Sequence, residues 1–166
     1  MTKFGKWVKI LASLIESLGG VSMKISLAAA FFLLLLICSI SDIRSRIIPN
    51  RLVIVLFPLG LLHSWLYMSL ADALLGILIP SIFLWLAKYK LDFYIGAGDI
   101  KLLSAIGIWI GWYANIYVLL AGSVIALVYA GIAGSLRRGK VSSIPFAPFL
   151  SAAAIAVYVG MVILQR

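Results

Sequence analysis

Long apolar runs fill most of this chain, and they restrict it to folds that can form in lipid. Six such segments follow one another with short polar stretches between them, at about 25–41, 52–70, 73–87, 102–114, 116–134 and 144–164. The runs are continuous and do not alternate between apolar and polar residues as half-buried strands do. In lipid, every backbone polar group must be paired within a helix or a closed barrel. We therefore expect an all-α membrane protein, a bundle of about six transmembrane helices.

The overall composition excludes an ordinary soluble domain. Of the 166 residues, 64% are hydrophobic and 11% are charged, whereas soluble domains are about half apolar and about a quarter charged. The net charge is +9, but the lysines and arginines gather in short polar stretches, as in loops that set membrane topology. A nucleic-acid partner would need a continuous basic face, so we expect a lipid bilayer as partner and no nucleic acid.

The first residues of the chain show a different pattern. Between residues 4 and 18, apolar side chains recur at helical spacing, and lysines and polar residues occupy the other side. This pattern predicts a basic amphipathic helix that lies in the membrane interface and ends at Gly19 and Gly20. We therefore divide the chain into an amphipathic interfacial segment, 1–24, and a six-helix transmembrane domain, 25–166.

The basic residues predict the side of the membrane on which each loop lies. They cluster after the first, third and fifth spans: Arg44, Arg46 and Arg51; Lys88, Lys90 and Lys101; Arg137, Arg138 and Lys140. The positive-inside rule places these three loops in the cytoplasm. The same topology leaves the N-terminal lysines outside, against the rule, so the side of the N-terminus stays open.

Two of the five acidic residues lie at the ends of spans, where charge is expensive. Asp42 ends the first span and Asp99 opens the fourth. Because an even number of spans separates them, we expect both carboxylates at the cytoplasmic edge of the bilayer. Ionisable groups this close to hydrocarbon often serve function. A helix N-terminus also stabilises an aspartate, which accounts for Asp99 without function but does not account for Asp42.

Two carboxylates are sufficient to hydrolyse a peptide bond. One takes a proton from the attacking water while the other donates a proton to the carbonyl oxygen, and like charges about 3 Å apart share one proton. Other catalytic groups are scarce. His63 is the single histidine and lies mid-span, where we expect a packing or hydrogen-bonding role, and Cys38 is the single cysteine. Without a cluster of Cys and His we expect no metal and no cofactor.

The residues around the second aspartate resemble a known motif. Gly96-Ala97-Gly98-Asp99 is similar to the Gly-x-Gly-Asp motif of the GxGD membrane aspartyl peptidases. The Ile-Lys-Leu-Leu sequence that follows, which includes Lys101, resembles the version found in type IV prepilin peptidases.

Two further segments resemble the same family. Asp42, with the basic residues and the Ile-Pro49-Asn50 sequence after it, is similar to the first catalytic aspartate and its loop. Residues 144–150 resemble the segment that opens the last helix. The three segments occur in the right order, so the resemblance covers roughly residues 25–164.

The resemblance implies an aspartic endopeptidase that removes the short basic leader from type IV prepilins or pseudopilins at the cytoplasmic face of the bacterial inner membrane. Asp42 and Asp99 carry over as the catalytic pair, and 25–166 as the peptidase domain. Other residues would shape the site or position the substrate: Gly96, Gly98, Lys101, Arg44, Pro49 and Asn50. For Arg44, Arg46 and Lys101, an alternative role in fixing topology is the better supported one.

The chain resembles the short members of that family. Longer, bifunctional members carry a cytoplasmic insertion with paired Cys-x-x-Cys motifs that is associated with zinc and with N-methylation, whereas this sequence has one cysteine. The resemblance therefore implies peptidase activity without methyltransferase activity. The particular substrate and the oligomeric state stay open.

Two other functions fit part of the pattern. An archaeal preflagellin peptidase would use the same two aspartates, although the Ile-Pro-Asn loop and the Pro-Phe-Ala-Pro segment favour the bacterial type. A non-enzymatic scaffold or an ion-coupled transporter subunit would use the aspartates to bind a proton or a cation. Ion-coupled transporters usually hold such groups near the bilayer midplane, whereas Asp42 and Asp99 are expected at one edge.

Overall fold

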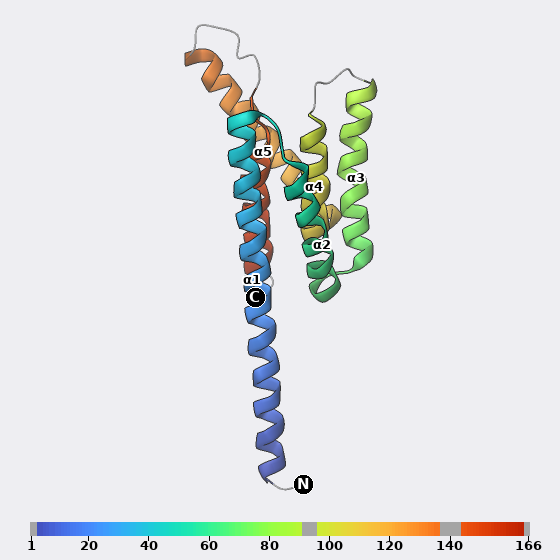
Figure 1. Cartoon of the computed structure of the whole chain (residues 1–166), viewed down its shortest axis with the longest axis vertical. Coiled ribbons are helices and arrows are strands. Elements are labelled where there is room, and N and C mark those ends of the chain that lie inside the picture. Colours follow the sequence, from blue (N-terminus) through green and yellow to red (C-terminus); the bar gives the residue numbers. More distant parts are fainter. Residues whose placement is uncertain (1–2, 91–95, 137–143, 165–166) are drawn as a thin grey trace.

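The computed structural model describes residues 3–90, 96–136 and 144–164, and for residues 3–18 and 136 it describes the backbone alone. Within these ranges the chain forms helices and no strand: α1 (Lys3–Ser45), α2 (Asn50–Tyr67), α3 (Leu70–Lys90), α4 (Ala97–Leu136) and α5 (Ala147–Leu164) (Figure 1). Each helix contains an apolar stretch long enough to cross a membrane. The chain is therefore an all-helical, multi-pass membrane protein, as its apolar runs predict. The basic residues of the predicted fifth loop lie outside the described ranges.

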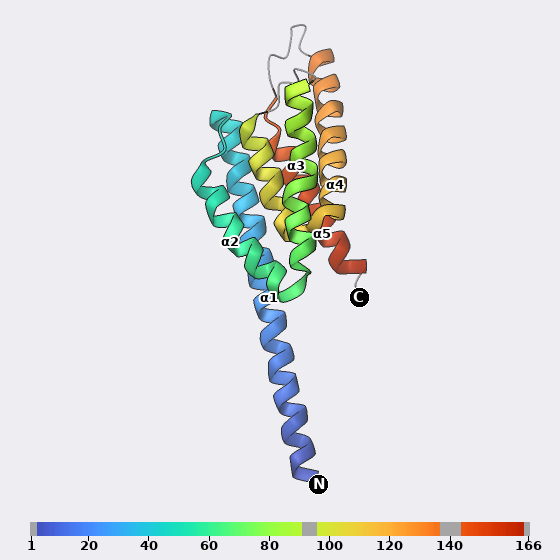
Figure 2. The ribbon, with the colours of Figure 1, turned by 90° about the vertical axis from the view of Figure 1, so that its right-hand side faces the viewer.

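α4 covers two of the six expected apolar segments, and the structure has five helices long and apolar enough to cross a membrane within the described residues. Its path is broken at Gly111, where φ is 79° and ψ is 170°, a conformation that glycine adopts without the steric cost of a side chain. The Asn115 side-chain nitrogen lies 3.0 Å from the Leu103 carbonyl oxygen, which a straight helix would place about 18 Å away along its axis. The chain therefore reverses direction at Gly111, and the second half of α4 runs back toward the end of the bundle at which the first half begins (Figure 2). The predicted fourth and fifth segments both lie within α4, but the break is at Gly111, inside the predicted fourth segment, and no polar loop separates the two halves.

The expected helix end at Gly19 and Gly20 is wrong. α1 is one continuous helix from Lys3 to Ser45, and its N-terminal part projects beyond the other helices (Figure 1). Each glycine costs a helix only about 1 kcal/mol relative to alanine, and neither removes a backbone hydrogen bond as proline would. The helix-forming runs on both sides therefore outweigh the two glycines. The location of residues 4–18 in the interface stays a prediction.

Two glycines let α3 approach the first half of α4 closely. A Cβ atom built on Gly76 would overlap the Gly107 carbonyl oxygen, and one built on Gly107 would overlap the Gly76 carbonyl oxygen. Asn115, fully buried, donates one hydrogen bond to the Gly76 carbonyl oxygen (3.1 Å) and another to that of Leu103. Small residues and buried amide side chains are the usual means by which helices associate in lipid. Together they join α3 to both halves of α4.

Aromatic side chains join α1, α2 and α5 to this pair. Trp109 stacks on Phe31 of α1, with ring centroids 4.6 Å apart, and donates its indole N–H to the Leu56 carbonyl oxygen of α2 (3.1 Å). His63 is buried, stacks on Trp109 and lies beside the Tyr158 hydroxyl of α5 (3.4 Å). This position confirms the packing role expected for His63. The surrounding apolar side chains that face outward, Trp65 among them, present an apolar surface suited to lipid.

The glycine contact predicts a sharp difference between two alanine substitutions. We expect Gly107→Ala to lower the free energy of unfolding by about 3 kcal/mol, because the new methyl group forces the backbones of α3 and α4 apart. Gly131→Ala is the matched control on the same helix, since a Cβ there would contact nothing within 4 Å. Thermal unfolding of both variants in the same detergent measures the effect. Equal stability of the two variants would contradict the proposed packing constraint.

Candidate active site

Asp42 lies in the last turn of α1 and is almost completely buried, at 6% exposure. Its Oδ2 accepts a hydrogen bond from the backbone N–H of Ala147, the first residue of α5 (3.0 Å). The first amides of a helix lack partners within the helix and carry partial positive charge, so they stabilise a carboxylate. The start of α5 thus compensates for the unfavourable position of Asp42 at the end of α1.

Asp99 lies in the first turn of α4 and is half-buried. Its backbone N–H donates to the Gly96 carbonyl oxygen (3.1 Å), which closes the turn that starts the helix. A Cβ atom at Gly96 would lie 2.9 Å from Oδ2 of Asp99, whereas one at Gly98 would make an ordinary 3.4 Å contact with Ile48. Of the two motif glycines, Gly96 is therefore the one that leaves space for the carboxylate.

The fold brings the two aspartates together. α2 and α3 separate them in sequence, so the end of α1 and the start of α4 lie at the same end of the bundle (Figure 1). The two carboxyl groups are close enough to interact electrostatically. Both line a cavity of about 370 Å³ and a neighbouring one of about 670 Å³. The arrangement gives a water-sized reactant access to both carboxylates.

The two cavities differ in their walls. The smaller one is bounded by the segment between α1 and α2, residues 46–50, and by the turn that starts α4, residues 96–99, with Lys101. The larger one extends along the second half of α4 and reaches α3 and the start of α5. Its further lining residues are mostly apolar or small: Leu84, Leu119, Ser123, Ala126, Leu127, Ala130, Ile144, Pro145 and Phe146. One side of the site is thus polar and the other side is apolar.

Most of the residues predicted to surround the aspartates line a cavity beside them, but Arg44 does not. Lys101 Nζ donates to Oδ1 of Asn50 at the start of α2 (3.1 Å), which ties the segment after α1 to α4. Pro49 is the N-cap of α2 and lines the smaller cavity, as do Gly96 and Gly98. Arg44 is exposed in the last turn of α1 and is not among the residues that line either cavity.

Arg46 has an unusual backbone conformation. Its φ is 54°, in the left-handed region, where a residue other than glycine pays roughly 1–2 kcal/mol. The turn is held by the Ser41 hydroxyl, which donates to the Ile47 carbonyl oxygen (3.0 Å), and by the Ser45 hydroxyl, which donates to the Ser41 carbonyl oxygen (2.8 Å). From the sequence, Arg46 was assigned chiefly to fixing membrane topology. No sequence pattern predicted its left-handed backbone conformation.

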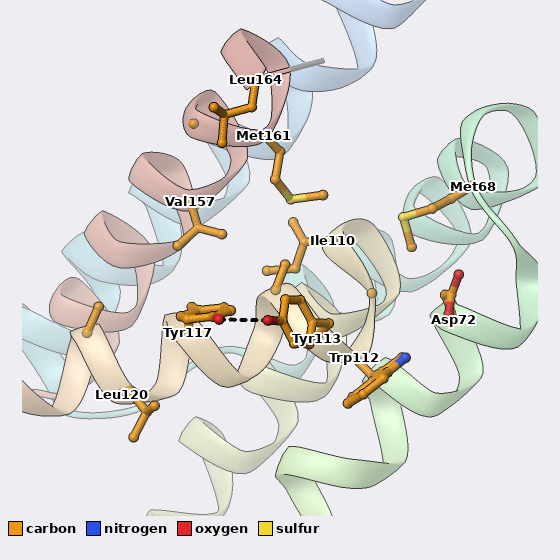
Figure 3. A pocket seen from close by; sticks show the side chains of 14 residues that line it. Met68, Asp72, Ile110, Trp112, Tyr113, Tyr117, Leu120, Val157, Met161 and Leu164 are labelled. Carbon is orange, nitrogen blue, oxygen red and sulfur yellow. Dashed lines mark hydrogen bonds between the residues drawn. The ribbon is translucent and has the colours of Figure 1, made fainter.

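A third cavity, of about 710 Å³, lies away from the aspartate pair (Figure 3). It is bounded by α5 and by the start of the second half of α4, where the hydroxyls of Tyr113 and Tyr117 are 2.9 Å apart. Asp72 is the one carboxylate among its lining residues. A single carboxylate cannot serve as both acid and base in one step, so this cavity does not offer the chemistry of the aspartate pair.

The aspartate pair is suited to hydrolysis by general acid and general base catalysis. One carboxylate can accept a proton from water while the other donates one to a carbonyl oxygen. Within the described ranges, no three His, Cys, Asp or Glu side chains gather closely enough to hold a metal ion. Two parts of this site were not predicted from the sequence: the Ala147 amide that binds Asp42, and the wall formed by the second half of α4. The helical spacing of Ser123, Ala126 and Ala130 was the one available signal for that wall.

Several known proteins are similar to this chain in sequence. A relative in Escherichia coli (strain K12), named prepilin leader peptidase/N-methyltransferase, is 31% identical over 128 residues, which cover 73% of this chain and 57% of that protein. A protein of the same name in Pseudomonas aeruginosa is 34% identical over 127 residues, covering 72% of this chain and 44% of that protein. The chain thus spans about half the length of the curated relatives it matches.

No solved structure has significant similarity to the chain. The sequence model of the type IV leader peptidase family matches residues 29–131, which include both aspartates. This match covers more than half of the chain, and the chain therefore belongs to the type IV leader peptidase family.

Proposed function

We propose that this protein is an aspartic endopeptidase that removes the short basic leader from type IV prepilins or pseudopilins, with Asp99 as its acid and Asp42 as its base. The observation that carries the proposal is that two aspartates on helices far apart in sequence line the same two cavities. Membership of the leader peptidase family and the names of the curated relatives support the substrate class.

The hydrogen bond of Asp42 supports an assignment of the base and acid roles. Oδ2 of Asp42 already acts as an acceptor, toward the Ala147 amide, so Asp42 is assigned the base that takes a proton from water. Asp99 then holds the shared proton and donates it to the carbonyl oxygen of the scissile bond. The water oxygen bonds to the carbonyl carbon and forms a tetrahedral diol. As the C–N bond breaks, Asp42 passes its proton to the leaving amine, and one hydroxyl of the diol returns a proton to Asp99 while the C=O bond re-forms.

The two walls of the site match a substrate that is polar on one side of the scissile bond and apolar on the other. The larger cavity offers apolar and small side chains along α4, and the smaller one offers Asn50 and Lys101. The arginines after α1 and the lysines that end α3 lie at the same end of the bundle as the aspartates, which supports a cytoplasmic site by the positive-inside rule.

Single substitutions of the aspartates test the proposed mechanism. We expect Asp42→Asn and Asp99→Asn each to lower the rate of prepilin cleavage about a thousandfold or more, because each removes one partner in proton transfer. Asp72→Asn is the matched control, since it changes a half-buried carboxylate of α3 that lines neither of the two cavities. Cleavage is followed by release of the leader in membranes with equal amounts of each variant.

Near-normal cleavage by either aspartate variant would refute the pairing. A folded wild-type protein that leaves a broad panel of prepilins intact would instead favour the scaffold or transporter function.

Alanine substitutions at the two motif glycines should separate geometry from stability. We expect Gly96→Ala to lower cleavage about a hundredfold, because a Cβ at 2.9 Å displaces the Asp99 carboxylate from its place opposite Asp42. The flexible carboxylate can move aside, so the melting temperature should change little. Gly98→Ala meets only an ordinary contact and should retain most activity. Similar losses in both variants would show that Gly96 has no special role beside the carboxylate.

A further inference from the structure

The backbone of Arg46 gives the first indication of a role for its side chain. Among the described residues, Arg46 is the single non-glycine residue with positive φ. Helices that end in this conformation usually place glycine there, because glycine has no Cβ to clash. Backbone outliers of this kind cluster at functional sites, where the surrounding structure holds them in place. An arginine at this position therefore suggests that its side chain is needed.

Hydrogen bonds and packing around Arg46 hold the backbone of its turn in place. Hydrogen bonds from Ser41 and Ser45 hold the backbone on both sides, and the Arg46 N–H bonds the Asp42 carbonyl oxygen (2.8 Å). Ile48, two residues later, is buried at 7% exposure and packs beside Gly98. The turn is thus anchored to α1 at one end and to the start of α4 at the other.

The location of Arg46 gives the second indication. Four residues line both the smaller and the larger cavity: Asp42, Arg46, Gly96 and Asp99. Among these four, Arg46 carries the one side chain that always donates hydrogen bonds. The other cation of the smaller cavity, Lys101, does not line the larger one. Arg46 therefore lies where the two cavities meet, next to the carboxylate pair.

A peptide in this site presents main-chain carbonyl oxygens, which need hydrogen-bond donors. The two carboxylates chiefly supply acceptors, whereas a guanidinium supplies five N–H groups in a rigid planar arrangement. We propose that Arg46 binds substrate carbonyl oxygens beside the scissile bond and so positions the peptide between Asp42 and Asp99. The inference deepens the peptidase function proposed above and rests on it. Arg44, which lines neither cavity, has no such role.

Replacement of Arg46 by asparagine tests this inference. Asparagine tolerates the left-handed backbone but lacks the guanidinium. We expect Arg46→Asn to raise the Kd of a fluorescent prepilin peptide, and the KM for its cleavage, about tenfold or more, with a much smaller change in kcat. Arg46→Lys, which keeps the charge but not the planar donors, should lie between wild type and Arg46→Asn. Arg51→Asn, an exposed change in the first turn of α2, is the matched control and should match wild type.

The basic leader of the peptide makes the sign of the effect informative. If Arg46 acted only as a nearby positive charge, its removal would reduce repulsion and tighten binding of a basic peptide. Only the loss of hydrogen bonds to the peptide would therefore make Arg46→Asn bind it more weakly.

Binding and melting temperature of the full-length protein in detergent distinguish the outcomes. Equal affinities of Arg46→Asn and Arg51→Asn would overturn the inference, and so would a lower melting temperature with unchanged affinity, which would indicate a purely structural role. A wild-type protein that binds the peptide through Arg46 without cutting it would sink the peptidase proposal and leave the inference standing. A wild-type protein that does not bind the peptide would overturn the role of Arg46.

Discussion

The backbone contact between Gly76 and Gly107 is the constraint on which the site depends most. It holds the first half of α4 against α3, and that half begins with the turn that carries Asp99. Asn115 then bonds the carbonyl oxygens of both helices and fixes where the second half of α4 returns. In lipid, water is excluded from both the folded and the separated helices, so close packing and hydrogen bonds must supply the specificity that hydrophobic burial supplies in soluble proteins.

The second constraint is electrostatic and involves the opposite side of the site. Asp42 is buried at the end of α1, where the helix dipole disfavours negative charge, and it keeps this place with the help of the Ala147 amide. The first residues of α5 are therefore part of the candidate active site, although they follow Asp42 by more than a hundred residues. A change that shifted the start of α5 would remove a partner from a buried carboxylate, which is more costly than loss of an ordinary surface hydrogen bond.

The sequence allowed a good part of the fold to be predicted, because lipid leaves few alternatives. The apolar runs located all six segments, and counting spans correctly placed Asp42 and Asp99 at one end of the bundle. The prediction that the first helix ends at Gly19 and Gly20 was wrong, because two glycines do not by themselves end a helix when helix-forming residues lie on both sides. The reversal at Gly111 and the left-handed backbone of Arg46 depend on tertiary contacts, so no local pattern predicted them. Arg44 and Arg46 look equivalent in the sequence, but only Arg46, in the turn after α1, lines the two cavities beside the aspartates.

The length of α1 has a mechanical consequence. Its 43 residues extend for about 65 Å, roughly twice the thickness of the hydrocarbon core. The part before Lys24 is therefore a lever arm attached to the helix that ends beside Asp42. A tilt of about 20°, typical for membrane helices, would displace the far end of that arm by about 10 Å. Gly19 and Gly20, where an added Cβ would contact nothing within 4 Å, lie along this arm and lack the side chain that restricts the backbone of other residues. A force on the N-terminal arm would pass through this pair to the end of α1 that carries Asp42, and it would also reach α2, because the Tyr67 hydroxyl donates to the Gly20 carbonyl oxygen (3.1 Å).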